Sequence, residues 1–315
     1  MRKCLASALL LPLLLWGCGK TTKVVTPVGI DEPDRVLYEN ALKQLERHDY
    51  PVARELLQTL ISTYQDSDYF PKAKYALAES FYREGGRESL DSAEAAFKDF
   101  IVYFRDSDLA DDAQMMVVMT QIKRIQSPDR DNTAARLAEL ELREMINSYP
   151  NSDLLEEAKE KLRLVQENLA DGIFRVSNQY LHAKNYKASV DRYTEIELKF
   201  PDFSKMDAVL FNHAESLYFT ENGDAAGKLY AELVRDYPAS KLVKPATQRL
   251  MELSIPVPPP NPAAVPRPAP NSDKNVLGKT FSVFKSKPAV PATTTAASVR
   301  DKDGAFTIDS NAAKD

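Results

Sequence analysis

Two Glu-Ser pairs are the residues of this chain best suited to bond-breaking chemistry. Glu79 and Ser80 lie in ALAESFY, and Glu215 and Ser216 lie in NHAESLYF. A carboxylic acid beside a scissile bond can act as a general acid, and glutamates cleave glycosidic bonds in that role. The two pairs, however, occupy the same place in two copies of a helical repeat, which duplication alone predicts. We therefore expect both pairs to be structural.

A known class of enzyme offers a direct comparison for these pairs. Bacterial lytic transglycosylases carry a catalytic Glu-Ser on an α-helical superhelix, which the pairs here resemble. Neither pair is followed by the glycine-rich, Met-Gln type of sequence that those enzymes show. An envelope hydrolase built on a helical solenoid is therefore the weakest of three hypotheses for the function.

The remaining polar residues do not form a pattern typical of a metal or cofactor site. His48, His182 and His213 are not at metal-ligand spacing. Asp129 and Asp131 lie in an Asp/Asn-rich loop, where carboxylates usually form turns and caps. No glycine-rich phosphate loop and no G-x-S-x-G elbow occur. We expect no catalytic residue, no metal and no cofactor.

The N-terminal residues have the features of a bacterial lipoprotein signal. Arg2 and Lys3 precede an apolar run that is too short to span a bilayer, and residues 1–17 are expected to be cleaved as a signal peptide. The residues around Gly17 and Cys18 resemble a lipobox, although Trp16 is bulkier than usual there. Cys18 is then the predicted lipidation site, residues 18–33 a lipidated tether, and several acyl chains would hold the protein on a membrane. The alternative is a simple signal peptide with an incidental cysteine.

Composition separates a globular region from a C-terminal tail. The chain has 315 residues, 43% of them hydrophobic and 28% charged, as in soluble globular proteins. A net charge of -5 gives no basic field for a nucleic acid. Ten of the 20 prolines follow Ser254, so residues 254–315 are expected to be a disordered Pro/Ala/Thr-rich tail. Residues 34–253 are left as the folded domain.

The folded domain contains one pattern written five times. A small residue is followed by apolar residues four and seven positions later and by a helix-breaking residue after five more. Steps of four and three lie on one face of an α-helix, and the small residue allows a neighbouring helix to come close. The five copies are Ala53, Leu57, Leu60 and Gln65; Ala93, Phe97, Phe100 and Arg105; Ala138, Leu142, Met145 and Pro150; Ser189, Tyr193, Ile196 and Pro201; Ala226, Tyr230, Leu233 and Pro238.

Each copy is predicted to be the second helix of a helical hairpin. Apolar stripes such as Leu37, Ala41 and Leu45 mark the first helix upstream, with short turns between the two. Ser67, Ser107 and Ser152, each followed by Asp, are expected to be the N-caps of the next helix. The pattern resembles the tetratricopeptide repeat. The predicted fold is therefore an all-α solenoid of about five tetratricopeptide-like hairpins.

Three stretches together with the lipobox resemble the BamD (YfiO-type) family of lipoproteins, part of the outer-membrane β-barrel assembly machinery. The resemblance covers roughly residues 34–250. Its most specific parts are the Asp-rich loop at 127–134 and the long helix expected after Ser152. The stretches are LYENALKQLERHDYPVARELLQTLISTYQDSDYFPKAKYALAESFY, SPDRDNTAARLAELELREMINSYPNSDLLEEAKEKL and LADGIFRVSNQYLHAKNYKASVDRYTEIELKFPD.

This resemblance implies a scaffold without catalytic activity, anchored by lipid to the periplasmic face of the outer membrane. It implies docking on a BamA-like barrel-forming component, beside other assembly lipoproteins, through the C-terminal repeats. Arg192 falls where the family carries an arginine implicated in docking; the alternative is a solvated charge. The N-terminal repeats would bind unfolded outer-membrane proteins, with Tyr38, Tyr75, Phe81 and Tyr82 as candidate contacts unless they are core residues.

A second hypothesis keeps the fold and changes the partners. A tetratricopeptide lipoprotein can also act as an adaptor that organises peptidoglycan enzymes or other envelope enzymes. The Pro-rich tail, which ordinary members of the BamD family lack or keep short, is the feature in its favour. Co-isolation of a β-barrel protein or of cell-wall enzymes from membranes distinguishes the two hypotheses.

Overall fold

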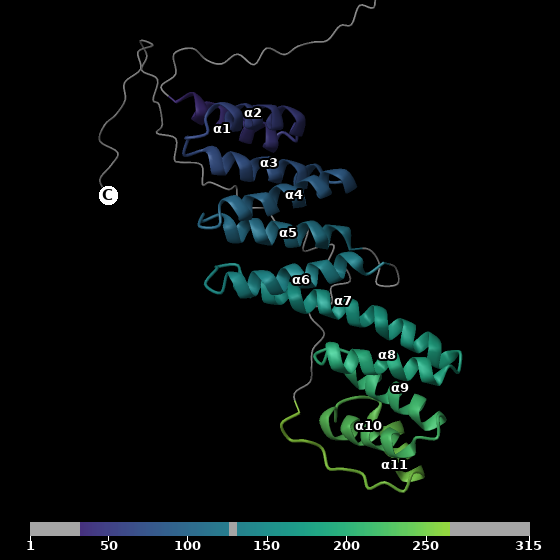
Figure 1. The fold of residues 1–315 in the computed structure, drawn as a ribbon. Helices are drawn as coiled ribbons and strands as arrows, with labels where there is room; N and C mark the ends of the chain where they lie inside the picture. Colours follow the sequence, from purple (N-terminus) through teal and green to yellow (C-terminus); the bar gives the residue numbers. More distant parts are fainter. Residues whose placement is uncertain (1–31, 126–130, 265–315) are drawn as a thin grey trace, which may run out of the picture.

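The computed structural model describes residues 32–125 and 131–264, and these residues form eleven α-helices and no strand. They are arranged one after another in an elongated stack, which confirms the all-α prediction (Figure 1). The helices are α1 (Pro33–Glu46), α2 (Tyr50–Thr63), α3 (Phe70–Glu84), α4 (Arg87–Tyr103), α5 (Ala110–Arg124), α6 (Thr133–Ser148), α7 (Leu155–His182), α8 (Tyr186–Lys199), α9 (Met206–Phe219), α10 (Gly223–Asp236) and α11 (Val243–Glu252).

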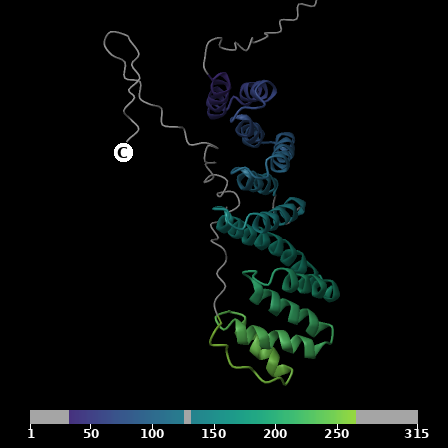
Figure 2. The same ribbon diagram turned by 60° about the vertical axis from the view of Figure 1, so that its left-hand side comes forward.

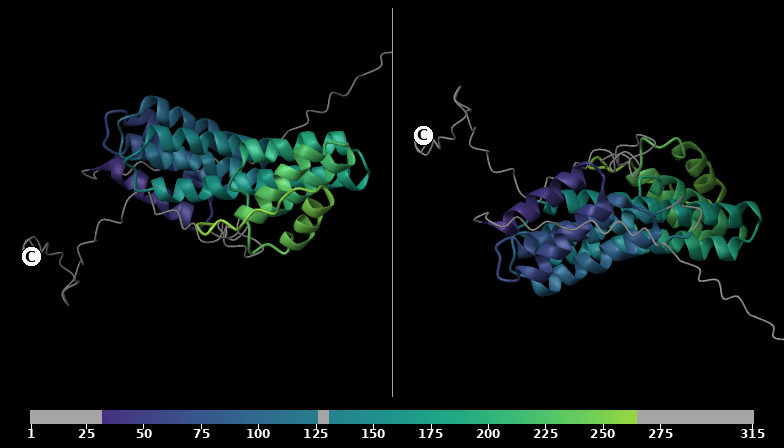
Figure 3. Two further views of the ribbon diagram at one scale, coloured as in Figure 1. Left: turned by 90° about the horizontal axis from the view of Figure 1, so that it is seen from below. Right: turned by 90° about the horizontal axis from the view of Figure 1, so that it is seen from above.

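The helices pair into five hairpins, α1–α2 to α9–α10, and α11 closes the stack. Each helix packs against the next one along the chain, so every hairpin is held between its neighbours. The turned view shows the superhelical path of the stack, and the views along its length show the helices side by side (Figures 2 and 3). This is the solenoid arrangement, in which a hairpin buries its apolar face only by stacking.

The structure confirms that the small and apolar positions of all five repeat copies are buried. The small residues Ala53, Ala93, Ala138, Ser189 and Ala226 are all fully buried. The second helices end at 63, 103, 148, 199 and 236, in each case two residues before the predicted breaker. The two apolar positions of every copy are also buried: Leu57, Leu60, Phe97, Phe100, Leu142, Met145, Tyr193, Ile196, Tyr230 and Leu233.

The turns between hairpins differ from the prediction in the role of serine. The Ser67 hydroxyl accepts the N–H of Tyr69 at 3.0 Å, but Tyr69 is the N-cap residue of α3 and has no side-chain cap. The predicted N-cap position is therefore wrong, because a short turn from Ser67 to Phe70 intervenes. Ser107 and Ser152 behave in the same way before α5 and α7.

The serine hydroxyl instead joins neighbouring hairpins. Ser67 donates to the Asp34 carboxylate, at the start of α1, at 2.5 Å. Ser152 donates to Asp111, at the start of α5, at 2.6 Å. The same contact recurs from Ser240 to Asp207 at 2.5 Å. In each case the serine lies in the turn that follows a hairpin, and it bonds an aspartate in the first turn of that hairpin's first helix.

The core is divided unevenly along the stack. One cluster joins α1, α2 and the start of α3, from Leu37 to Ala76. A second joins α3, α4 and α5, from Tyr75 to Val117. A third runs from Met115 in α5 to Leu250 in α11 without interruption. The C-terminal hairpins therefore share one core, whereas the N-terminal hairpins have two small ones.

A short segment after α11 packs back onto α10. A Cβ added to Gly227 would lie 2.1 Å from the Ile255 Cδ1, so the glycine leaves the space that the Ile255 side chain fills. The Asn261 N–H donates to the Arg235 carbonyl at 2.8 Å, and its side-chain amide donates to Asp236 at 3.3 Å. The packed region therefore continues beyond residue 253, where the tail was predicted to begin. Residues 265–315 of that predicted tail lie outside the described residues.

Candidate partner-binding surfaces

The predicted lipidation site, Cys18, lies outside the described residues, as do residues 1–17 of the predicted signal peptide and most of the tether. The described chain begins at Glu32, and α1 follows immediately with Pro33 in its first turn. Within 32–125 and 131–264, no helix combines the length and apolar character needed to cross a bilayer. Attachment through Cys18 therefore stays a prediction.

The structure places two of the four predicted aromatic contacts in the core. Tyr38 is only 2% exposed, its ring lies 5.4 Å from that of Tyr69, and burial raises its pKa. Tyr75 is 7% exposed and contacts the edges of Phe97 and Phe100 at 5.4 and 5.8 Å. Neither ring is presented to a partner. The alternative, that these aromatics are core residues, therefore applies to both: Tyr38 belongs to the core of α1, α2 and the start of α3, and Tyr75 belongs to the core of α3, α4 and α5.

The other two predicted aromatic contacts are half-buried near the C-terminal end of α3. The Arg54 guanidinium lies 4.8 Å from the centre of the Phe81 ring, and the Lys123 ammonium lies 4.0 Å from that of Tyr82. We call these four residues the aromatic-cation patch. Partial burial raises the pKa of Tyr82 to about 12 and lowers that of Lys123. The patch thus combines apolar rings with two cations from neighbouring hairpins.

A salt bridge holds Arg54 of the patch in place, and a hydrogen bond to a backbone carbonyl holds Lys123. Arg54 pairs with both oxygens of Glu84, at 3.0 and 3.2 Å, and Ser89 donates to the same carboxylate. Arg54 and Ser89 together lower the pKa of Glu84. The Lys123 ammonium donates to the Tyr82 carbonyl at 2.8 Å. Sequence analysis missed both cations, because they come from α2 and α5 and share no spacing with the aromatics.

Arg192 lies on α8 with half of its side chain exposed. Its guanidinium donates to Glu195 at 2.9 Å, and Lys199 donates to the same carboxylate at 2.8 Å. The two cations lower the pKa of Glu195, with Lys199 having the larger effect. Arg192 is therefore oriented along the helix surface and remains accessible to a partner.

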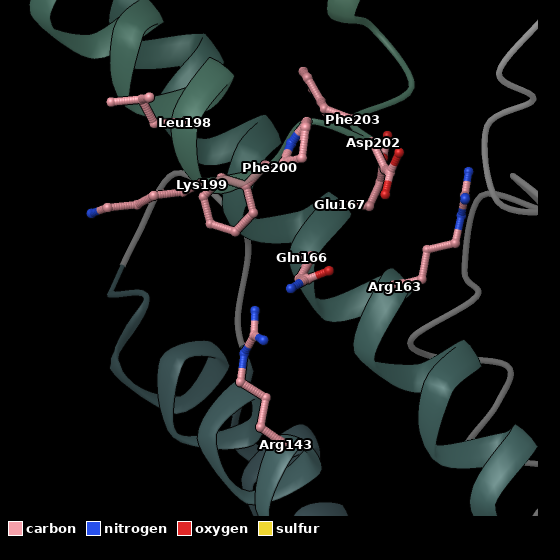
Figure 4. Close-up of a pocket in the computed structure, with 10 residues that line it drawn as sticks. Arg143, Arg163, Gln166, Glu167, Leu198, Lys199, Phe200, Asp202 and Phe203 are labelled. Carbon is pink, nitrogen blue, oxygen red and sulfur yellow. The ribbon is translucent and has the colours of Figure 1, made fainter. Parts of the chain in front are cut away.

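A cleft of about 350 Å³ lies where α6, α7 and the turn after α8 meet (Figure 4). Arg143, Arg163 and Lys199 bring positive charge to it, and Glu167 and Asp202 bring negative charge. The Glu167 carboxylate is already engaged, because it accepts the N–H and the hydroxyl of Ser204. We call it the mixed-charge cleft. It was not predicted, because its residues come from three separate elements.

Comparison with known proteins identifies the family. The model of the YfiO family, described as outer membrane lipoprotein, matches residues 30–220. The chain belongs to the YfiO family. The match covers α1 to α9, including the aromatic-cation patch, Arg192 and the mixed-charge cleft.

Curated relatives carry the name outer membrane protein assembly factor BamD. The protein of Vibrio cholerae is 26% identical over 205 residues, covering 62% of this chain and 83% of the relative. That of Rickettsia prowazekii is 22% identical over 244 residues, covering 76% and 94%. That of Caulobacter vibrioides is 21% identical over 285 residues, covering 90% of each. The YfiO-family resemblance seen in the sequence is thus confirmed.

The Glu-Ser pairs of this YfiO-family chain are occupied by structural contacts. Glu79 is buried and pairs with Arg83 at 2.7 Å, while the Ser80 hydroxyl donates to the Leu77 carbonyl. Glu215 accepts from Arg249 through both of its oxygens, at 2.8 and 2.9 Å. Ser216 donates to the Asn212 carbonyl within its own helix. Neither glutamate faces the mixed-charge cleft.

Two of the three histidines and Asp131 of the Asp-rich loop also have local partners. His213 lies 2.7 Å from Glu197, and His48 lies 2.8 Å from the Tyr50 hydroxyl. Asp131 accepts the N–H and hydroxyl of Thr133, which lowers its pKa. Asp129 lies outside the described residues. In the part of the chain that the structure describes, no three His, Cys, Asp or Glu side chains gather as a metal site would require.

Proposed function

We propose that this protein is an outer-membrane protein assembly factor that acts as a scaffold without catalytic activity. The observation that carries the proposal is the match of residues 30–220 to the YfiO family, together with relatives named BamD that align over most of their length. In this proposal, the protein is attached through acylated Cys18 to the periplasmic face of the outer membrane.

The C-terminal hairpins provide the docking surface for a BamA-like barrel-forming component and for other assembly lipoproteins. Arg192 supports this role, because an exposed guanidinium can pair with a partner carboxylate. At the start of the same helix, the ring of Tyr186 stacks with that of Phe219 at the end of α9, with 5.0 Å between their centres, and Phe219 is exposed. Aromatic and arginine side chains are enriched among the residues that carry the binding energy of protein interfaces. The single core beneath these residues keeps them in fixed positions.

The N-terminal hairpins bind unfolded outer-membrane proteins. The aromatic-cation patch supports this role, because Phe81 and Tyr82 can stack with an aromatic residue of an extended peptide. Arg54 and Lys123 can pair with a terminal carboxylate beside that residue. Tyr38 and Tyr75, which are buried, position α3 and do not contact the peptide.

Catalysis is not part of the proposal, because the two glutamates suited to it already form ion pairs. Glu79 and Glu215 each accept from an arginine, so both carboxylates are already held in ion pairs within the stack and neither is free to act on a substrate. Replacing either glutamate with glutamine should leave any wall-degrading activity of a purified sample unchanged. A loss of such activity in both variants would support the hydrolase hypothesis instead.

Affinity purification from gently solubilised membranes tests the proposed partners. We expect the wild-type protein to isolate a β-barrel protein that carries periplasmic repeat domains, and we expect Arg192→Glu to lose it. Arg35→Glu is the matched control, because Arg35 is also half exposed, at 48%, and also pairs with glutamates of its own helix. Isolation of cell-wall enzymes without a β-barrel protein would support the adaptor hypothesis.

A further inference from the structure

Two large apolar side chains are exposed together at the end of α4. Val102 is 70% exposed and Tyr103 is 78% exposed, and they are the last two residues of that helix. Among the described residues, they are the only exposed large apolar side chains that are neighbours in the sequence. A tyrosine beside a valine presents an apolar surface with one polar tip, a combination that is enriched where proteins meet the bilayer interface.

Side-chain contacts connect this pair to the start of the described chain. The Asp34 carboxylate in the first turn of α1 holds the turn before α3 through Ser67. Phe70, the first residue of α3, lies 6.0 Å from Phe104, the residue after Tyr103. Figure 1 shows the beginning of α1 and the turn between α4 and α5 on the same side of the stack. We call this side, formed by Tyr69, Phe70, Val102, Tyr103 and Phe104, the tether edge.

The length of the chain before α1 limits how far the tether edge can lie from Cys18. Thirteen residues separate Cys18 from Glu32. Fully extended, that segment spans at most about 50 Å, and as a flexible coil its end-to-end distance is about 20 Å. Neighbouring helices pack about 8–10 Å apart, so the start of α1 and the end of α4 lie within about 30 Å of each other. A bilayer that holds Cys18 is thus within reach of the tether edge.

We infer that the tether edge inserts Val102 and Tyr103 into the interface of the bilayer to which Cys18 is attached. The inference rests on the anchor at Cys18 in the proposed function. Membrane contact at this edge would orient the stack, because a single lipid attachment point at Cys18 does not by itself fix which side faces the bilayer. The aromatic-cation patch, near the opposite end of α3, would then face away from the membrane toward the periplasm.

The charges of the tether edge indicate which lipid surface it fits. The cations Lys72 and Lys74 lie over the rings of Tyr69 and Phe70, at 5.3 and 5.8 Å. The adjoining turns also expose Asp66, Asp68, Asp106 and Asp108. These acids oppose attraction to an anionic surface. The contact should therefore be apolar, form on zwitterionic phosphatidylcholine, and change little with ionic strength.

The cysteine and tryptophan content of the chain allows a direct test. From residue 18 onward, Cys18 is the only cysteine and there is no tryptophan. The chain from Cys18 to Asp315, which the predicted cleavage would leave of this sequence, can be coupled at Cys18 to a maleimide lipid in phosphatidylcholine vesicles. This coupling replaces natural acylation, so the test does not depend on whether cells acylate Cys18. Tyr103→Trp then places a single fluorophore at the tether edge.

Quenching by brominated phosphatidylcholine measures insertion. We expect strong quenching and a blue-shifted emission for Tyr103→Trp, equal at low and high salt. Leu140→Trp is the matched control, because Leu140 is 61% exposed but lies in the middle of α6; we expect no quenching there. Equal quenching of the two variants, or none at position 103, would overturn the inference. Failure of natural acylation at Cys18 would appear separately, as release of the wild-type protein from membranes.

Discussion

The two halves of the stack use the same repeat but are held together differently. In the N-terminal half, two small cores meet at α3, and the buried hydroxyl of Tyr38 has no hydrogen-bond partner among the residues that the structure describes. In the C-terminal half, one core continues to α11, and buried hydroxyls pair across helices, as Ser189 and Ser216 do at 2.7 Å, although the side-chain oxygen of Asn168 has no partner among the described residues. The same sequence repeat thus determines each helical hairpin, but it does not determine how many hairpins share one hydrophobic core.

The largest effect should come from truncating the same repeat position in the two halves. Phe97 and Tyr193 are both fully buried, and each replacement by alanine should cost about 3–5 kcal/mol. Because the cores are separate, Phe97→Ala should raise amide hydrogen exchange mainly in α3 to α5. Tyr193→Ala should raise it from α5 to α11. Hydrogen exchange with mass spectrometry measures both patterns, and identical patterns would show that the stack unfolds as one unit.

A smaller effect should distinguish two buried tyrosines. Tyr230 donates to Glu215 at 2.5 Å, and Arg249 completes the network, so Tyr230→Phe should cost about 1–3 kcal/mol. Tyr38→Phe removes a hydroxyl without a partner and should be neutral or slightly stabilising. Denaturant unfolding measures the two free energies. An equal loss of unfolding free energy in both variants would contradict the view that only the Tyr230 hydroxyl makes a stabilising hydrogen bond.

The smallest effect should come from the serine contacts between hairpins, and it should depend on pH. Ser67→Ala should cost about 0.5–1.5 kcal/mol at neutral pH, because it removes the bond to the Asp34 carboxylate. That bond lowers the pKa of Asp34. A lowered folded-state pKa stabilises the protein above the ordinary aspartate pKa, and this stabilisation is lost as pH falls through the lowered value.

Unfolding of Ser67→Ala and wild type at pH 7 and at acid pH checks this expectation. The difference between the two proteins should shrink once Asp34 is protonated. Ser240→Ala, which removes the equivalent bond to Asp207, is the matched variant in the C-terminal half. A difference for Ser67→Ala that stays constant with pH would mean that the serine acts through the turn alone.

The sequence was sufficient to predict what depends on local spacing. Ala93, Phe97 and Phe100 follow the helical period, so their burial and the end of α4 could be inferred. The contact between Ser67 and Asp34 could not, because it joins residues 33 positions apart. The packing of Ile255 could not be predicted for a different reason. Its Pro-rich surroundings are typical of disorder, and the space that it fills is made by Gly227.

The candidate surfaces were harder to predict than the fold. Aromatic residues on first helices can point to the core or to a partner, and the sequence does not distinguish Tyr75 from Tyr82. The structure does, because Tyr75 is buried in the core of α3, α4 and α5, whereas Tyr82 is only half-buried and lies beside Lys123. Arg54 and Lys123 became candidates only when the fold placed them over the rings of Phe81 and Tyr82.

Site-specific photo-cross-linking in living cells tests the central claim, a scaffold with separate surfaces for clients and for the assembly machinery. A benzoylphenylalanine would replace Phe81 in one variant and Arg192 in the other. We predict cross-links from position 81 to unfolded outer-membrane proteins and from position 192 to the β-barrel component with periplasmic repeat domains. Cross-links from both positions to cell-wall enzymes, with neither predicted partner, would contradict the account.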